Sequence, residues 1–324
     1  MQWRLKSLVQ NAAALLPEQA GLAMYYLMQR SFGALRDYSP WRRTEAAIGI
    51  FDRIRRLDAE PVNATFFEVG TGRVPVVPLL LWLMGAKRTI TVDLNRYLST
   101  SLTLSAMRLL AAQQNELRGL LGERLVADRL ASLEMQLDSA ARRPIAEVLS
   151  RVGIDYRAPS DAAHTGIVDK SIDFHISYTV LEHVSEASIR AILAEGRRIL
   201  APAGLAVHFI DYSDHFSHSD RSIDAVHFLR FEDRQWQALA GNRFMYANRL
   251  RDDDFLRIAR EAGFDIEIHE PRTDTEILEK LGRRVLPLAR RFRDKPDPVL
   301  ATTHAWLVLR PASKGRGAEV TRQS

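Results

Sequence analysis

The chain has 324 residues, of which 46% are hydrophobic and 26% are charged, and its formal net charge is +5 at pH 7. This balance is typical of a globular protein, and no stretch approaches the roughly 20 consecutive apolar residues that would span a membrane. Cysteine is absent, which excludes disulfides, thiolate metal sites and a cysteine nucleophile. We expect a cytoplasmic protein and leave open a peripheral contact with the inner face of the membrane.

The first 60 residues are expected to form a helical segment that packs on the main domain. Apolar residues recur there at three- and four-residue spacing, and Pro40 separates two helical stretches. From Thr65 onward, short apolar runs alternate with helical patterns, which is typical of a parallel sheet in an α/β domain. We predict strands at residues 65–69, 88–93, 154–156, 172–177, 205–211, 264–269 and 304–309.

Helical patterns connect these strands within a domain that we place at residues 61–310. The predicted helices cover residues 75–84, 95–150, 186–200 and 252–262. An irregular polar and aromatic segment at about 212–250 is expected to form a lid. The tail, residues 311–324, is small and polar, and we expect it to be disordered.

A short buried strand, Thr65–Val69, runs into two glycines, Gly70 and Gly72. Glycines at this point let the backbone approach a ligand at the carboxyl edge of a sheet, and the next helix directs free N–H groups there. The third glycine of the dinucleotide fingerprint would fall at Pro75, which argues against a pyrophosphate-binding dehydrogenase. Asp93 ends the second strand, where its carboxylate can bind both hydroxyls of a ribose or cap the next helix.

These segments resemble, in the expected order, the motifs of class I S-adenosylmethionine-dependent methyltransferases. FFEVGTGRVPVVPLLLWLMGAKRTITVDLNRYL is similar to the first two motifs, YRAPSDAAHTGIVDKSIDFHISYTVLEHV to the next two, and RRILAPAGLAVHFID to the helix, turn and fifth strand that follow. The resemblance implies a Rossmann-like, doubly wound, seven-stranded and mostly parallel sheet with a lid after the fifth strand. It also implies S-adenosyl-L-methionine as the cofactor, bound by Glu68, Gly70, Thr71, Gly72, Asp93, Leu94, Asp161, Ala162, Ser177 and Tyr178.

The sequence departs from the family at several positions. Val74 stands where many members have a further glycine. The segment 177–180 reads S-Y-T-V and lacks the proline of the signature that base-methylating members carry, so nucleic acid is not the expected partner. Glu182 and His183 match two metal ligands of some ubiquinone-type O-methyltransferases, but Thr179 stands at the third, acidic position. We therefore predict no metal site.

The polar segment that follows the fifth strand is the candidate for acceptor chemistry, because ligands bind at this edge of open α/β sheets. A histidine there can accept a hydroxyl proton near neutral pH, and a carboxylate can orient its ring. We predict His215 or His218 as the general base, with Asp211, Asp214 or Asp220 as its helper. The alternative is a polar lid in which these residues only form turns.

Aromatic and arginine side chains in the lid suit a polar, anionic acceptor: Phe228, Trp236, Phe244, Tyr246, Arg230, Arg243 and Arg249. The leading hypothesis is O-methylation of a small polar acceptor in bacteria, such as a sugar or a polysaccharide precursor. An RNA or protein methyltransferase that docks through the basic segment 281–295 is one alternative, although such a segment is more often a solvated helix face. A non-catalytic nucleoside-binding scaffold is the other. The sequence indicates no oligomeric state.

Overall fold

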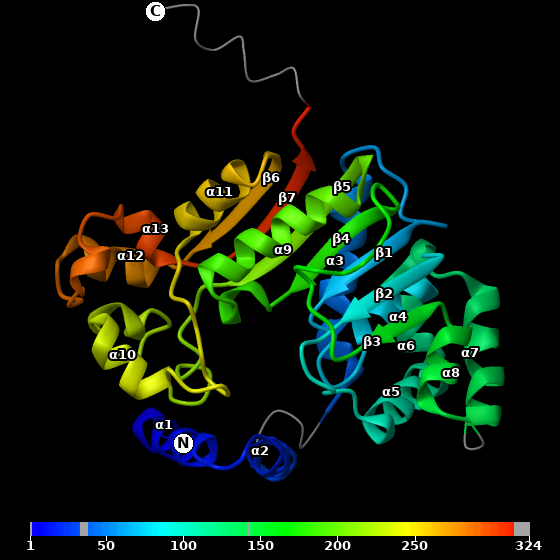
Figure 1. Ribbon diagram of the computed structural model, residues 1–324, viewed down its shortest axis with the longest axis horizontal. Coiled ribbons are helices and arrows are strands. Elements are labelled where there is room, and N and C mark those ends of the chain that lie inside the picture. Colours follow the sequence, from blue (N-terminus) through cyan, green and yellow to red (C-terminus); the bar gives the residue numbers. More distant parts are fainter. Residues whose placement is uncertain (1, 33–37, 141–142, 314–324) are drawn as a thin grey trace, which may run out of the picture.

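The computed structural model describes residues 2–32, 38–140 and 143–313, and its centre is a seven-stranded sheet with the order β3-β2-β1-β4-β5-β7-β6 (Figure 1). β7 is antiparallel to both of its neighbours, and the other adjacent pairs are parallel. The predicted Rossmann-like, mostly parallel α/β sheet is confirmed. The strands are β1 Thr65–Val69, β2 Arg88–Val92, β3 Ile154–Arg157, β4 Ile172–Tyr178, β5 Leu200–Asp211, β6 Phe264–Thr273 and β7 Thr302–Pro311.

Helices cover both faces of the sheet and make a three-layer sandwich. One face packs against α9 (Glu186–Ile199) and α11 (Asp252–Glu261). The predicted helical stretch 95–150 forms four helices, α5 to α8, and a short 3₁₀ helix. The helices over the other face are α3 (Thr44–Arg55), α4 (Val76–Leu83), α5 (Thr100–Ala112), α6 (Gln114–Leu121), α7 (Ala127–Ala140) and α8 (Ile145–Arg151).

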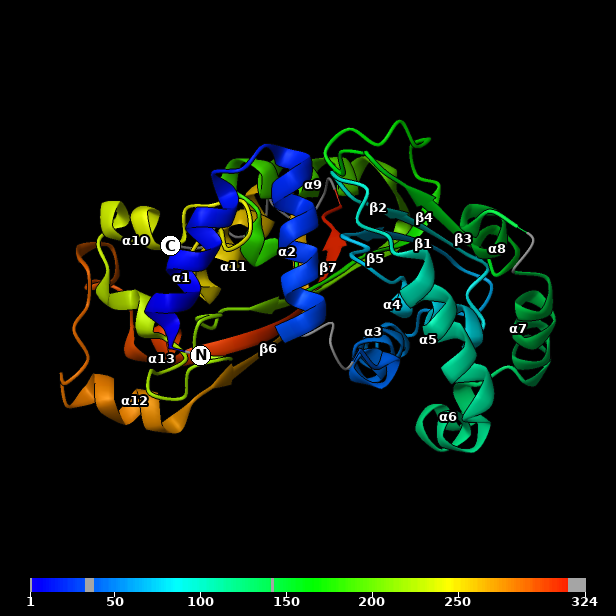
Figure 2. The same ribbon diagram turned by 90° about the horizontal axis from the view of Figure 1, so that it is seen from below.

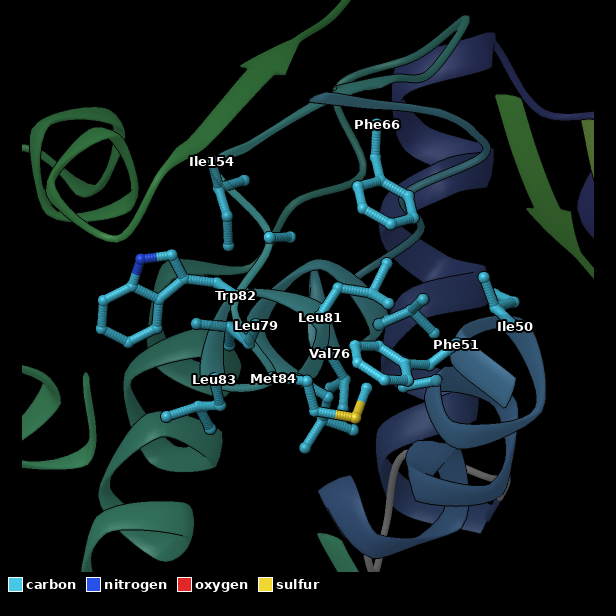
Figure 3. Packing of buried hydrophobic residues seen from close by; sticks show 14 of the residues in the cluster. Ile50, Phe51, Phe66, Val76, Leu79, Leu81, Trp82, Leu83, Met84 and Ile154 are labelled. Atoms are coloured by element: carbon cyan, nitrogen blue, oxygen red, sulfur yellow. The ribbon is translucent and has the colours of Figure 1, made fainter. Parts of the chain in front are cut away.

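Helix α4 explains why the N-terminal segment belongs to the core. All its residues, VVPLLLWL, are buried, and a helix that is apolar on every side must be covered on every side. β1 covers one side through Phe66, and α3 covers another through Ile50 and Phe51 (Figure 3). The strand and the two helices therefore share one apolar cluster.

The first two helices, α1 (Trp3–Ala14) and α2 (Glu18–Phe32), lie beside the lid (Figure 2). The indole of Trp3 contacts the rings of Phe216 and His227, and the Ser7 hydroxyl donates to the Leu239 carbonyl at 2.6 Å. The N-terminal segment is thus divided, with α3 on the sheet and α1 on the lid. No helix in the described part of the chain is both long and apolar enough to cross a membrane.

The segment after β5 is largely irregular, as predicted, but it belongs to a small subdomain with its own apolar core, which the sequence did not indicate. It contains α10 (Asp233–Ala240) and packs on α12 (Thr275–Gly282) and α13 (Asp297–Ala301), which come from the β6–β7 connection. Side chains from both segments are buried together: Phe216, Phe228, Trp236, Met245, Ile277, Leu281, Phe292 and Leu300.

The basic segment 281–295 is mostly not helical, which corrects the helix expected there. Only its first two residues belong to α12, and a three-residue 3₁₀ helix, Arg290–Phe292, follows later. Several of its cations pair with acidic groups: Arg284 with Asp297 at 3.0 Å, Arg291 with Asp233 at 3.0 Å and Lys295 with Asp253 at 2.7 Å. The expected disorder of the tail concerns mainly residues 314–324, which lie outside the described residues, whereas Pro311 ends β7.

A fully buried arginine, Arg251, fixes the place where the lid leaves the sheet. Its guanidinium donates hydrogen bonds to the carbonyl oxygens of Tyr212, just after β5, and of Val299, Leu300 and Thr302, just before and within β7. One side chain therefore joins the start of α11 to the beginning of the lid and to the β6–β7 connection that packs on the lid.

We predict that Arg251→Met lowers the free energy of unfolding by at least about 3 kcal/mol, because buried carbonyls left without donors cost about 1–3 kcal/mol each. Urea denaturation measures the change. Arg260→Met, at an exposed position on the same helix, is the matched control and should change stability by less than about 0.5 kcal/mol. Equal effects of the two substitutions would contradict the anchoring role of Arg251.

Candidate functional site

The register of the parallel strands brings the predicted motifs to one edge of the sheet. Val69, at the end of β1, pairs with Val92 of β2 on one side and with Ser177 of β4 on the other. A cavity of about 800 Å³ lies at this edge. Its lining includes Leu22, Tyr38, Arg43, Glu68, Gly70, Thr71, Gly72, Arg73, Asp93, Leu94, Asp161, Ala162, Tyr178, Thr179, His183 and Arg243.

The turn after β1 requires its two glycines. Gly70 and Gly72 have φ angles of +84° and +70°, a region that side chains other than glycine rarely adopt. A Cβ on Gly70 would also lie 2.5 Å from a methyl group of Val180, whereas a Cβ on Gly72 would meet nothing within 4 Å. The N–H of Gly72 donates to the Asp93 carboxylate at 2.9 Å, so the turn is joined directly to the end of β2.

Two buried carboxylates, Glu68 and Asp93, form the floor of the cavity beside this turn. Glu68 accepts a hydrogen bond from the Thr91 hydroxyl at 2.5 Å, and Thr91 also contacts the Thr71 hydroxyl. Burial raises the pKa of Glu68 to about 8 and that of Asp93 to about 7. A ligand that donates hydrogen bonds to these groups would offset the cost of burying their charges.

A third motif closes the cavity next to β2. The Asp161 carboxylate accepts a hydrogen bond from the Ala163 N–H at 2.9 Å, and this bond lowers the pKa of Asp161. The preceding N–H, that of Ser160, donates to the Asp93 carbonyl at 2.8 Å. Asp161, Ala162 and Leu94 then offer a polar group and two apolar groups to the same space.

The residues at the end of β4 point to opposite sides of the sheet. Tyr178 lines the cavity, stacks on Phe209 at 4.6 Å and lies 5.1 Å below the guanidinium of Arg43. Ser177 is buried, and its hydroxyl contacts Nδ1 of His208 at 2.7 Å. Because Ser177 is absent from the cavity lining, we leave it out of the cofactor site.

The predicted catalytic residues gather beside the cavity and not on its wall. Nε2 of His215 lies 3.4 Å from the Asp211 carboxylate, and Nε2 of His218 lies 3.8 Å from it. The His215 ring is 4.8 Å from the ring of His183, which does line the cavity. The neighbouring Glu182 is buried, which raises its pKa well above the usual value.

The other two predicted helpers, Asp214 and Asp220, serve the structure of the lid. Asp214 is buried, lies 3.4 Å from His227 and accepts from the Phe216 N–H at 2.9 Å. Asp220 accepts hydrogen bonds from the Ser222 hydroxyl and from the Trp3 N–H. Asp211 is therefore the candidate that is placed to act with the histidines.

Part of the cavity lining could not be predicted from the sequence. Leu22, Tyr38 and Arg43 come from the N-terminal segment, and no spacing in the sequence connects them with the glycine turn. Arg243, from the lid, also lines the cavity and was predicted for an acceptor site. Burial raises the pKa of Tyr38 above its usual value.

Comparison with protein-family models finds no match for this sequence, and a search of curated proteins finds none either. Solved structures that match include S-adenosylmethionine-dependent methyltransferases. One from Mesorhizobium loti has 14% identity and a TM-score of 0.42, with 80% of this chain and 96% of that chain covered.

Two further matches carry acceptor molecules. The geranyl diphosphate C-methyltransferase from Streptomyces coelicolor, in complex with Mg²⁺, geranyl diphosphate and S-adenosylhomocysteine, has 12% identity, a TM-score of 0.44 and coverages of 83% and 81%. A phosphoethanolamine N-methyltransferase from Haemonchus contortus, in complex with phosphomonomethylethanolamine and S-adenosylhomocysteine, has 14% identity, a TM-score of 0.46 and coverages of 92% and 59%. These activities belong to the matched proteins.

We predict that Gly70→Ala is more damaging than Gly72→Ala, although both place alanine at a positive φ. The backbone strain is about 1–2 kcal/mol at either position, and the contact with Val180 adds about 1–3 kcal/mol of overpacking at Gly70. Chemical denaturation of both variants measures the difference. Val180→Ala should restore part of the stability of Gly70→Ala, and strictly additive effects in this cycle would contradict the contact.

We predict that the free energy of unfolding falls as pH rises between the unfolded and the folded pKa of Glu68. Its folded pKa of about 8 exceeds the unfolded value of about 4.3, so the folded state binds more protons between these values. Stability then decreases with rising pH. Urea denaturation from pH 5 to pH 8 should show a shallower decrease for Glu68→Gln than for the wild type. Glu279→Gln, at an exposed position, should retain the wild-type slope, and an unchanged slope in Glu68→Gln would count against this account.

Proposed function

We propose that the chain is an S-adenosylmethionine-dependent methyltransferase that methylates a hydroxyl group of a small polar acceptor, such as a sugar or a polysaccharide precursor. The observation that carries the proposal is the convergence of three motifs on one cavity: the turn at Gly70 and Gly72, the carboxylate of Asp93 and the segment at Asp161. If these residues had separate structural roles, they would not need to line the same cavity.

The residues present fit each part of the cofactor. The turn at Gly72, where a Cβ would meet nothing within 4 Å, leaves space for the methionine part close to the backbone. Asp93 suits a ribose, because a carboxylate accepts hydrogen bonds from both hydroxyls. Leu94 and Ala162 offer apolar surface to the adenine base of the cofactor. The cofactor supplies a methyl group on a sulfonium, and fixed orientation of reactants is worth an effective molarity of about 10⁵–10⁸ M.

The remainder of the cavity suits a polar acceptor. Its volume of about 800 Å³ lies in the upper part of the usual range for ligand sites, about 300–1,000 Å³. Arg43 and Arg243 lie on its wall, and guanidinium groups favour anionic ligands such as a sugar phosphate. His183 leads from the cavity to His215, so an acceptor hydroxyl can approach the cluster that takes up its proton.

The other functions have less support. The cations of segment 281–295 that pair with Asp297, Asp233 and Asp253 are partly neutralised, which weakens a docking surface for RNA or an acidic protein. The peripheral membrane contact stays a prediction. The feature that favours it is the exposure of leucines on and just after the first two helices: Leu5, Leu8, Leu15 and Leu27.

We predict that the full chain binds S-adenosylmethionine and that Asp93→Asn weakens this binding by about tenfold or more. A hydrogen bond to a charged group contributes about 1.5–3 kcal/mol, and 1.4 kcal/mol corresponds to a factor of ten. Calorimetric titration measures the affinity. Asp294→Asn, an exposed carboxylate outside the cavity, is the control and should bind like the wild type.

Parallel titration with NAD separates this proposal from a dinucleotide-binding function. Binding of S-adenosylmethionine by the wild type and the control, with the loss in Asp93→Asn, supports the proposal. Tight binding of NAD without binding of S-adenosylmethionine would overturn it, because the missing glycine at Pro75 would then not have excluded a dinucleotide.

A further inference from the structure

Five side chains that can bind a metal ion meet beside the cavity. The donor atoms of Glu182, His183 and His215 lie within 4.8 Å of one another, and so do those of Asp211, His215 and His218. The five residues come from the turn after β4, from the end of β5 and from the lid. His215 belongs to both sets, so the two sets form one continuous cluster.

Three buried polar atoms of this cluster lack a hydrogen-bond partner among the described residues, whereas Nε2 of His218 contacts the Ser213 hydroxyl at 2.8 Å. Glu182 is 4% exposed, and among the described residues neither of its carboxylate oxygens has a hydrogen-bond partner. Nε2 of His215 also has none there. Nearly all buried polar groups in proteins have a partner, and an exception calls for an explanation such as a bound ion or a catalytic role. Two neighbouring carboxylates among imidazoles suit a cation better than a neutral water.

Hydrogen bonds with neighbouring residues hold parts of this cluster in place, as is usual for the ligands of a metal site. Nδ1 of His183 contacts the Tyr246 carbonyl at 2.8 Å, and the tautomer that donates this bond leaves the Nε2 lone pair free. Metal-binding histidines are typically fixed by such a bond from the other ring nitrogen. The Asn248 side chain donates to the carbonyls of Leu181 and Val184 at 2.8 Å, which holds the turn that carries Glu182.

We propose that this cluster binds one divalent transition-metal ion, with His215 as the ligand that both sets share. A mixture of imidazole and carboxylate ligands suits ions such as Mn²⁺, Fe²⁺, Co²⁺ and Zn²⁺, whereas Ca²⁺ and Mg²⁺ prefer oxygen ligands alone. The sequence predicted no metal site because Thr179 stands where an acidic ligand was expected. In the structure Asp211, from the next strand, places a carboxylate in the cluster.

The role of the ion rests on the proposed function. His183 belongs both to the cluster and to the wall of the cavity, so an acceptor hydroxyl can complete the coordination of the ion. With the ion bound, His215 is a ligand, and this role replaces its proposed role as general base: coordination lowers the pKa of the acceptor hydroxyl, whose proton passes to solvent water. The oxygen then forms a bond to the methyl carbon while the carbon–sulfur bond breaks and its electron pair stays on sulfur. The products are a methyl ether, S-adenosylhomocysteine and a proton.

We predict that the full chain, stripped with EDTA and dialysed, binds one equivalent of Co²⁺. Binding is seen as a change in the visible d–d absorption bands of Co²⁺ when protein ligands replace water. Glu182→Gln and His215→Ala should each weaken the binding by about tenfold or more, because each removes a direct ligand and loss of even an indirect partner costs about 10–100-fold in metal affinity. His164→Ala is the matched control. His164 is an exposed histidine 3.2 Å from the Asp161 carboxylate, and its loss should leave Co²⁺ binding unchanged.

The same samples are titrated with S-adenosylmethionine, and their folding is checked by thermal denaturation. Co²⁺ binding by the wild type and the control, with its loss in folded Glu182→Gln and His215→Ala, supports the inference. It is overturned if the wild type does not bind Co²⁺, or if both folded variants bind it as the wild type does. Co²⁺ binding without S-adenosylmethionine binding would leave the metal site standing and remove the proposed function, so the two failures are distinguishable.

Discussion

The parallel arrangement of β1, β2, β4 and β5 is the constraint on which the rest of the site depends. Parallel strands end at the same edge of a sheet, so every segment that follows one of them starts from a common line. The register places Val69 beside Ser177, and Tyr178 beside Phe209 of β5. The glycine turn, the Glu182–His183 turn and the lid therefore begin within reach of one another. The cavity and the neighbouring cluster of carboxylates and histidines are two consequences of one backbone arrangement.

Buried carboxylates at this edge show that the site is not optimised for stability alone. Glu68, Asp93 and Glu182 are all buried, and burial raises the pKa of each. Burying a carboxylate is costly unless a donor or a cation compensates it. Thr91 gives Glu68 a hydrogen bond and the backbone of Gly72 gives one to Asp93, but both groups still face the cavity. Their charges are compensated if a nucleoside donates hydrogen bonds to Glu68 or Asp93 and a metal ion contributes its positive charge at Glu182.

Local patterns predicted the sheet well because strands and their glycine turns are specified by adjacent residues. The seven predicted strands, the turn at Gly70 and the carboxylate of Asp93 are all found at the expected places. The lid is largely irregular, as predicted, but its apolar core was missed because that core is shared with a distant segment, as in the contact between Phe228 and Phe292. Such a core leaves no periodic pattern of apolar residues in the sequence.

Ser177 illustrates another limit, since alternation along β4 places either Ser177 or Tyr178 toward the cavity, and the sequence does not say which.

The proposed acceptor side of the site is built largely by parts of the chain outside the sheet. Trp3 of α1 packs against the lid, and the Lys6 ammonium donates to the carbonyl oxygen of His215 at 3.0 Å. The lid in turn holds the Glu182–His183 turn through Asn248, whose N–H donates to the Glu182 carbonyl at 2.9 Å. The position of His215 therefore depends on α1 as well as on β5. Changes in α1 or in the lid can alter the acceptor end without disturbing the strands that form the cofactor end. This separation is physically sensible, because methyl transfer needs an invariant donor geometry, whereas the acceptor is the variable partner.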